Sequence, residues 1–141
     1  MITMFSFDFA GCGKSEGEYI SLGWYERDDV EIVVDWLRNS GRVSTIGLWG
    51  RSMGAVTGLM HADRDPSIAG LVLDSPFSNL RTLAEELAKN NSKIPSLVLS
   101  GAIAMIRKSI LSKAKFDIDL LNPLENHVKK AFIPAFFVSG L

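Results

Sequence analysis

Two spacings of hydrophobic residues alternate along the chain, and together they predict strands separated by helices. Four short apolar runs, each typical of a buried strand, lie at residues 4–8, 45–49, 69–74 and 132–139. Apolar residues with helical spacing predict helices at residues 24–39, 79–89 and 96–111, and a further helix is expected to end near residue 62. This alternation predicts an α/β fold, with a parallel sheet flanked by helices.

Composition narrows the classes of protein that fit this pattern. Hydrophobic residues make up 47% of the 141 positions and charged residues 22%, which is typical of one globular domain. The net charge is -1 and there is no basic run, so no nucleic acid partner is expected. Cys12 is the single cysteine, which favours a reducing, cytoplasmic location. We expect no transmembrane segment, because the longest apolar stretch is interrupted and too short.

A short motif after the second predicted strand carries the candidate chemistry. Residues 50–54 read GRSMG, which fits the G-x-S-x-G nucleophile elbow between a strand and a helix. In such an elbow Ser52 is the nucleophile, and side chains at Gly50 and Gly54 would collide with the adjoining strand and helix. The backbone N–H of Met53 is the predicted oxyanion donor.

A glycine-rich loop follows the first predicted strand and allows a competing interpretation. Residues 13–15 read GKS, as in phosphate-binding loops, but that pattern requires glycine at the position of Asp8. A dinucleotide-binding pattern also fails, because its third glycine falls one residue late, at Gly17. Nucleotide binding is therefore disfavoured.

Four motifs in order resemble the α/β-hydrolase superfamily, in particular its serine aminopeptidase-like and depalmitoylase-like branch. They are DFAGCGKSEG at 8–17, GRSMG at 50–54, LDSPF at 73–77 and IPAFFV at 133–138. The resemblance implies a serine hydrolase that acts on an ester, thioester or amide of a small-molecule or acyl substrate, with no metal or organic cofactor. It also implies one partial domain over residues 1–141, with a lid-like helical insertion at about 79–122.

The remaining triad residues are not evident in the chain. In the family an aspartate follows the strand that resembles residues 133–138, and a histidine lies near the C-terminus; both positions fall outside this chain. His61 is expected on the far side of the helix that leaves the elbow, and His127 at the opposite edge of the sheet, so both are predicted to be surface or loop residues. Asp74 is a possible acid at the correct edge, or else a residue that caps the following turn.

The resemblance also predicts a gap in the sheet. In the family another strand lies between the strand that resembles residues 4–8 and the strand before the elbow, and it supplies the second oxyanion N–H. Exposed strand edges would favour self-association. The alternative hypothesis is therefore a non-catalytic fragment or interaction module. Trp24, Trp36 and Trp49 are expected in the core or between helices and sheet.

Overall fold

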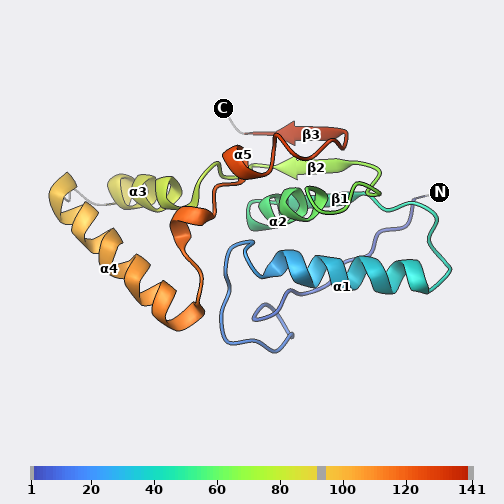
Figure 1. The fold of residues 1–141 in the computed structure, drawn as a ribbon, viewed down its shortest axis with the longest axis horizontal. Helices are drawn as coiled ribbons and strands as arrows, with labels where there is room; N and C mark the ends of the chain where they lie inside the picture. The colour runs from blue at the N-terminus through green and yellow to red at the C-terminus, as the bar shows by residue number, and fades with distance from the viewer. Residues whose placement is uncertain (1, 92–94, 140–141) are drawn as a thin grey trace.

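A three-stranded parallel sheet forms the centre of the protein. The structure, a computed structural model, describes residues 2–91 and 95–139. The strands are β1 (Leu48–Arg51), β2 (Leu71–Asp74) and β3 (Ala135–Val138), and they lie in the order β1-β2-β3. β1 pairs with β2, and β2 with β3, both in parallel. The predicted α/β fold is confirmed, as an incomplete sheet flanked by helices (Figure 1).

Helices connect the strands, as the hydrophobic spacing predicted. They are α1 (Glu26–Asn39), α2 (Met53–Ala62), α3 (Leu80–Asn91), α4 (Ser96–Ala114), the 3-10 helix η1 (Ile118–Leu120) and α5 (Pro123–Asn126). In α1, acidic residues occupy the first turn and Arg38 the last, which suits the helix dipole. Among the described residues, no helix combines the length and the apolar character needed to span a bilayer.

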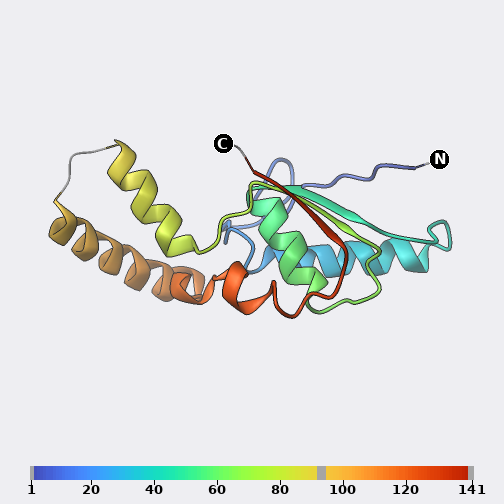
Figure 2. The ribbon, with the colours of Figure 1, turned by 90° about the horizontal axis from the view of Figure 1, so that it is seen from above.

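One face of the sheet is covered, chiefly by α2, with α1 packed beside it (Figure 2). Every residue of α2 from Ala55 to Ala62 is buried. Leu59 and Ala62 of α2 join Val30 and Val34 of α1 and Leu71 of β2 in one apolar cluster. A helix buried along most of its length cannot shift without disturbing its neighbours, so α2 restricts the positions of the segments attached to its ends.

The other face of the sheet is bare in the described part of the chain. Trp49, Val72 and Phe136 lie in register across the three strands, and they are 73%, 37% and 66% exposed. The prediction that all three tryptophans pack inside is therefore wrong for Trp49, and also for Trp36, which is 61% exposed on α1. No described element covers the face that carries Trp49, so its indole faces solvent.

The predicted strand at residues 4–8 is also wrong. The segment has no strand assignment, and Met4, Phe5 and Phe7 are 77%, 51% and 38% exposed. Its aromatic rings contact each other, Phe9, and Trp36, whose centroid lies 5.9 Å from that of Phe5. A strand needs a paired backbone, and no described residue pairs with this segment.

The segment from α3 to η1 forms a second packed unit beside α2. Leu80 of α3, Leu99 and Ile103 of α4, and Ile118 of η1 share a cluster with Val56 of α2. Ion pairs reinforce it: Arg107 of α4 bonds Asp117 and Asp119, and Arg81 of α3 also reaches Asp119. Figure 1 shows α3 and α4 extending away from the sheet as a hairpin-like pair.

His61 lies at the end of α2 and is buried, at 2% exposure, so the prediction that it is a surface or loop residue is wrong. Neither ring nitrogen has a hydrogen-bond partner among the described residues, and the closest charge is Asp65 Oδ2 at 3.4 Å from Nε2. Burial lowers the pKa of His61 below its usual 6.5, and the Asp65 carboxylate opposes that effect only in part.

We therefore expect acid to destabilise the fold through His61. The unfolded chain takes up a proton near pH 6.5 while native His61 stays neutral, so the free energy of unfolding falls as the pH decreases below about 6.5. Because one group takes up one proton, the free energy of unfolding can change through His61 by at most about 1.4 kcal/mol per pH unit. Urea unfolding at pH 7.5 and 5.5 should show this loss, and His61→Leu should reduce it.

Asp65 does not confound this comparison. Its burial raises the pKa, but hydrogen bonds from Ser67 and Arg38 outweigh burial and hold the pKa below 3.8, so it titrates below the tested range. An equal loss of stability in wild type and His61→Leu between pH 7.5 and 5.5 would contradict the assignment.

Candidate functional site

Ser52 lies at the junction of β1 and α2, in a backbone conformation that side chains rarely adopt. Its φ is 49° and its ψ is -113°, and the residue is exposed. Outside glycine such a conformation costs on the order of 1–3 kcal/mol, and it persists only where the surroundings enforce it. The predicted sharp bend between strand and helix is therefore present, with Ser52 at its tip.

The side chain of Ser52 does not do what serine at this position normally does. Ser52 is the N-cap residue of α2, where a serine hydroxyl usually accepts a hydrogen bond from the second or third N–H of the helix. That bond is absent, although it is worth about 1 kcal/mol. The hydroxyl also has no other hydrogen bond within the described residues. The bend thus presents a hydroxyl that takes no part in holding the helix.

The two glycines of the motif differ in what they permit. A Cβ on Gly50 would lie 2.2 Å from the carbonyl carbon and oxygen of Gly54 and 2.5 Å from the nitrogen of Ala55. A Cβ on Gly54 would meet no atom within 4 Å among the described residues. The predicted collision is therefore correct for Gly50 and wrong for Gly54, because only the strand side of the bend lies against the helix backbone.

Backbone groups around Ser52 include both structural hydrogen bonds and free donors. The N–H of Ser52 donates to the carbonyl of Asp74 at 2.8 Å, and its carbonyl accepts from Val56 at 3.1 Å. The Met53 N–H, the first of the helix, has no acceptor among the residues that the structure describes. A free N–H at a helix N-terminus, next to an exposed hydroxyl, can stabilise negative charge there.

Asp74 ends β2 beside the bend and is engaged in local contacts. In register it lies opposite Arg51, whose Nε is 3.7 Å from Oδ2. Its other oxygen accepts a hydrogen bond from the Ser75 hydroxyl at 2.8 Å. These contacts fit the alternative in which Asp74 organises the turn after β2, and Ser75 itself has a φ of 50°.

No imidazole approaches Ser52 within the described part of the chain. His61 lies in the last turn of α2, and His127 Nδ1 lies 2.8 Å from Oδ2 of Asp63, which caps the same end of that helix. Ten helical residues rise about 15 Å, so both rings are remote from the bend. Each histidine lies next to an acidic group at that end of the helix, His61 next to Asp65 and His127 next to Asp63. Neither histidine is therefore placed to activate Ser52.

The glycine-rich loop is organised by its own aspartate. Oδ2 of Asp8 accepts from the N–H of Lys14 at 3.0 Å, and its backbone carbonyl accepts from the Ser15 hydroxyl at 2.8 Å. Gly13 has a φ of 54°, and a Cβ there would lie 2.2 Å from the Asp8 carboxylate. The carboxylate thus occupies the centre of the loop, where a phosphate-binding loop would hold its anion.

Glu26 holds a loop that packs against α2 one turn after Ser52, and nothing in the sequence singled it out. It is 2% exposed, and its carboxylate accepts from the N–H groups of Ser21 and Gly23 and from the Ser21 hydroxyl. Gly23 in turn lies against Val56, one turn after Ser52, where an added Cβ would come within 3.0 Å. Acidic residues are common in the first turn of a helix, so the sequence carried no signal that this one is buried.

Comparison with known proteins gives one family. The sequence profile of the family described as "Serine aminopeptidase, S33" matches residues 2–130. An uncharacterized protein of Bacillus subtilis, YqkD, is 39% identical over 75 residues, which cover 51% of this chain and 25% of that protein.

No group of three histidine, cysteine or acidic residues suited to a metal ion occurs in residues 2–91 and 95–139.

Solved structures with a similar fold are crystal forms of the esterase Pf2001 of Pyrococcus furiosus. One superimposes with a TM-score of 0.65 and 27% identity, over 94% of this chain and 46% of the esterase chain. A second form gives a TM-score of 0.64 at 24% identity, with 94% and 47% covered. The chain thus spans about half the length of the esterase and a quarter of the B. subtilis protein.

The two glycines provide a matched test of the bend. Gly50→Ala should destabilise the protein by several kcal/mol or prevent folding, because the added methyl overlaps backbone atoms that cannot move away. Gly54→Ala lies in the first turn of α2 with open space around it, so its free energy of unfolding should stay within about 1 kcal/mol of wild type. Chemical denaturation measures both, and comparable losses in the two variants would show that the contact at Gly50 does not govern the bend.

Proposed function

Because the chain belongs to the serine aminopeptidase S33 family of α/β-hydrolases, we propose that Ser52 is the nucleophile of a serine hydrolase that cleaves an ester, thioester or amide. Ser52 Oγ attacks the substrate carbonyl, and the Met53 N–H stabilises the oxyanion that forms. Gly50 and Gly54 are the elbow glycines. The esterase Pf2001 supports a hydrolytic activity by its likeness in fold and sequence.

One observation carries the proposal: Ser52 is an N-cap serine that does not cap its helix. Both its strained φ and its missing cap bond work against stability, together on the order of 2–4 kcal/mol. A serine that only terminated a helix would adopt the ordinary N-cap conformation and keep its hydrogen bond. A strained turn that exposes a hydroxyl beside a free N–H is the arrangement of the nucleophile elbow.

The proposal assigns the base and the acid to sequence outside these 141 residues. Neither His61 nor His127 is placed to accept the proton of Ser52, and Asp74 has no imidazole to orient. We further propose that α3 and α4, within residues 79–122, form a lid over the site, and that the protein works in the cytoplasm with a small-molecule or acyl substrate. On its own the chain is then expected to lack activity.

Labelling with a fluorophosphonate probe tests the assignment of Ser52. The 141-residue chain should label weakly or not at all, because no base activates the hydroxyl. If the reading frame continues with G-x-x-D and a later histidine, the longer protein should label, and Ser52→Ala should abolish the signal. Ser75→Ala is the matched control, because Ser75 is also exposed at this edge with positive φ, and it should label like wild type.

Three outcomes separate the hypotheses. Labelling of the longer protein that survives Ser52→Ala would mean that another residue is the nucleophile. Labelling of the 141-residue chain at Ser52 would mean that a base lies within it. If neither protein labels, the hydrolase proposal fails and the second candidate function gains support.

The second candidate is an interaction module that associates through its sheet. The observation that favours it is the row of Trp49, Val72 and Phe136, exposed side by side across the bare face. β1 and β3 are also edge strands in the described sheet, and exposed edges pair readily with other chains. Such a surface on an isolated chain would promote self-association.

Light scattering after size-exclusion chromatography measures this association. The wild-type chain should show an apparent mass that rises with concentration, and Trp49→Glu should shift it towards the monomer. Trp36→Glu is the control, because Trp36 is similarly exposed but lies on α1 rather than on the sheet. A monomer at all concentrations that unfolds in one cooperative thermal transition would contradict the proposal.

A further inference from the structure

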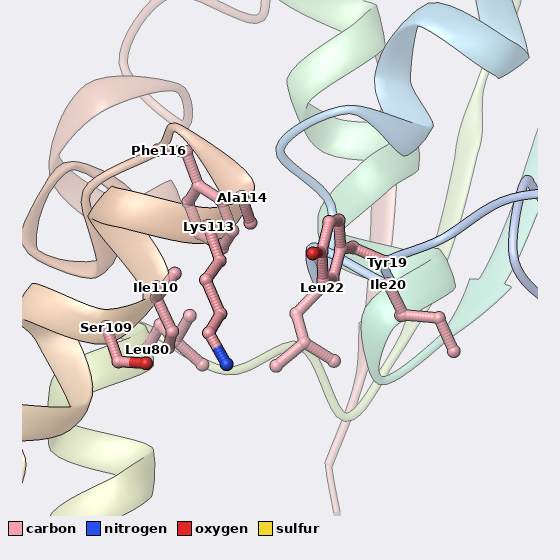
Figure 3. Close-up of a pocket in the computed structure, with 9 residues that line it drawn as sticks. All are labelled: Tyr19, Ile20, Leu22, Leu80, Ser109, Ile110, Lys113, Ala114 and Phe116. Atoms are coloured by element: carbon pink, nitrogen blue, oxygen red, sulfur yellow. The ribbon is translucent and has the colours of Figure 1, made fainter.

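A half-open apolar cavity of about 180 Å³ lies between a loop and the end of α4, and none of its lining residues belongs to the bend at Ser52. The loop side is formed by Tyr19, Ile20 and Leu22, which are 43%, 49% and 37% exposed. The opposite side is formed by Ile110, Ala114 and Phe116. Figure 3 shows the two groups facing each other across the opening.

The loop side of the cavity is held in place by buried contacts. Glu26 accepts hydrogen bonds from the N–H groups of Ser21 and Gly23, the two residues that flank Leu22. Gly23 lies against Val56 of the buried helix α2. Leu22 has a φ of 58°, a conformation that these flanking bonds enforce. The apolar side chains of the loop are therefore kept partly exposed by the backbone, instead of collapsing onto α4.

The α4 side is equally fixed. The Tyr25 hydroxyl donates to the carbonyl of Ala114 at 2.8 Å, which ties the end of α4 to the start of α1. Phe116 is 5% exposed and stacks on Trp24, with Tyr25 against its edge. Because contacts with the rest of the protein hold both sides of the cavity, the cavity is preformed. A preformed cavity lowers the entropic cost of binding a ligand.

One charge is available at this cavity, and it is positive. Lys113 lines the cavity and forms no ion pair within the described residues, whereas Arg81 and Arg107 of the same helical unit are paired with acidic groups. In Figure 3 the Lys113 side chain runs along the cavity and its amine ends between Leu80 and Leu22. On the loop side, Glu18 precedes Tyr19 in the chain and already accepts a hydrogen bond from the Tyr19 hydroxyl at 2.7 Å.

From the apolar walls, the fixed shape and the unpaired amine, we propose that this cavity binds a small carboxylate with a short hydrocarbon body. A cavity of roughly 150 Å³ accommodates a benzene ring, so about 180 Å³ suits one ring or an alkyl chain of about six carbons. The hydrocarbon covers Leu22, Ile110 and Phe116, and the carboxylate pairs with Lys113. The proposal does not rest on the chemistry of Ser52, and its test measures binding alone.

Three ligands that differ only in their head group test the site: hexanoate, hexanol and hexylamine. Each is titrated into the isotope-labelled 141-residue chain at pH 7 while backbone amide shifts are followed by NMR. Hexanoate should bind with a Kd on the order of millimolar, as expected for about eight heavy atoms. Shifts should centre on Leu22, Ile110 and Phe116. Because an exposed ion pair contributes modestly, hexanoate should bind about two- to fivefold tighter than hexanol.

Variants separate the contribution of Lys113 from that of the cavity. Lys113→Met should make hexanoate and hexanol bind equally, whereas Lys108→Met, the same change on an exposed residue of α4 outside the cavity, should keep the preference. Ser109→Trp, at an exposed lining position, should fill the opening and reduce the affinity for all three ligands at least tenfold. The amide spectrum should remain that of the folded protein.

The proposal is overturned by any of three results. Hexylamine binding tightest would show that Glu18, not Lys113, sets the preference. Equal binding of hexanoate and hexanol to wild type would remove the role of charge. Shifts scattered over the bare sheet face, unaffected by Ser109→Trp, would show that the ligands bind Trp49 and its neighbours instead.

Discussion

The close approach of β1 to the first turn of α2 is the constraint on which the arrangement of this protein depends. Gly50 lies so near the backbone of Gly54 that no side chain fits between them. With the strand that close, the chain has one residue in which to turn into the helix, and Ser52 turns with φ at 49°. The exposure of the Ser52 hydroxyl is a consequence of this backbone packing. It therefore does not depend on an interaction of the side chain.

Strain of this kind persists only in a rigid frame, and α2 provides it. The helix lies between two apolar clusters, with Leu59 and Ala62 in the one shared with the sheet and α1, and Val56 and Met60 in the one shared with α3 and α4. Each cluster loses contacts if the helix moves, so relaxation of Ser52 would cost more packing than it recovers in backbone energy. The loop held by Glu26 adds a third contact at Val56.

The sequence predicted the elements whose signals are local. The motif at residues 50–54 lies between a strand and a helix because its glycines determine what can follow, and the helical spacing located α1 within two residues at its start. The failures are non-local. His61 is buried in α2, which packs against α1 and α5, and Trp49 is exposed because no described element covers its face. A hydrophobic pattern states that a residue prefers burial, but it does not say whether a covering element is present.

The same distinction explains why half of the candidate site was predictable. Ser52 and Met53 are neighbours in sequence, whereas the cavity beside Lys113 joins two segments almost ninety residues apart, as the bond between Tyr25 and Ala114 does. Glu26 escaped notice for a related reason, because its burial depends on the loop that folds back over it. Spacing along the chain carries no information about such pairings.

The charges near the N-termini of α1 and α2 differ, and this difference affects the electrostatic field at Ser52. The first turn of α1 carries Glu26, Asp28 and Asp29, which compensate the positive end of its dipole. The first turn of α2 carries no acidic residue, and Asp74, the acid closest along the sheet edge, is occupied by Arg51 and the Ser75 hydroxyl. The positive end of α2 therefore remains uncompensated beside Ser52, whose hydroxyl has no hydrogen bond among the described residues. An acidic residue there would stabilise the helix by about 0.3–1 kcal/mol. The first turns of α3 and α4 lack one as well. Without one, the N-terminus of α2 keeps its positive character beside the Ser52 hydroxyl.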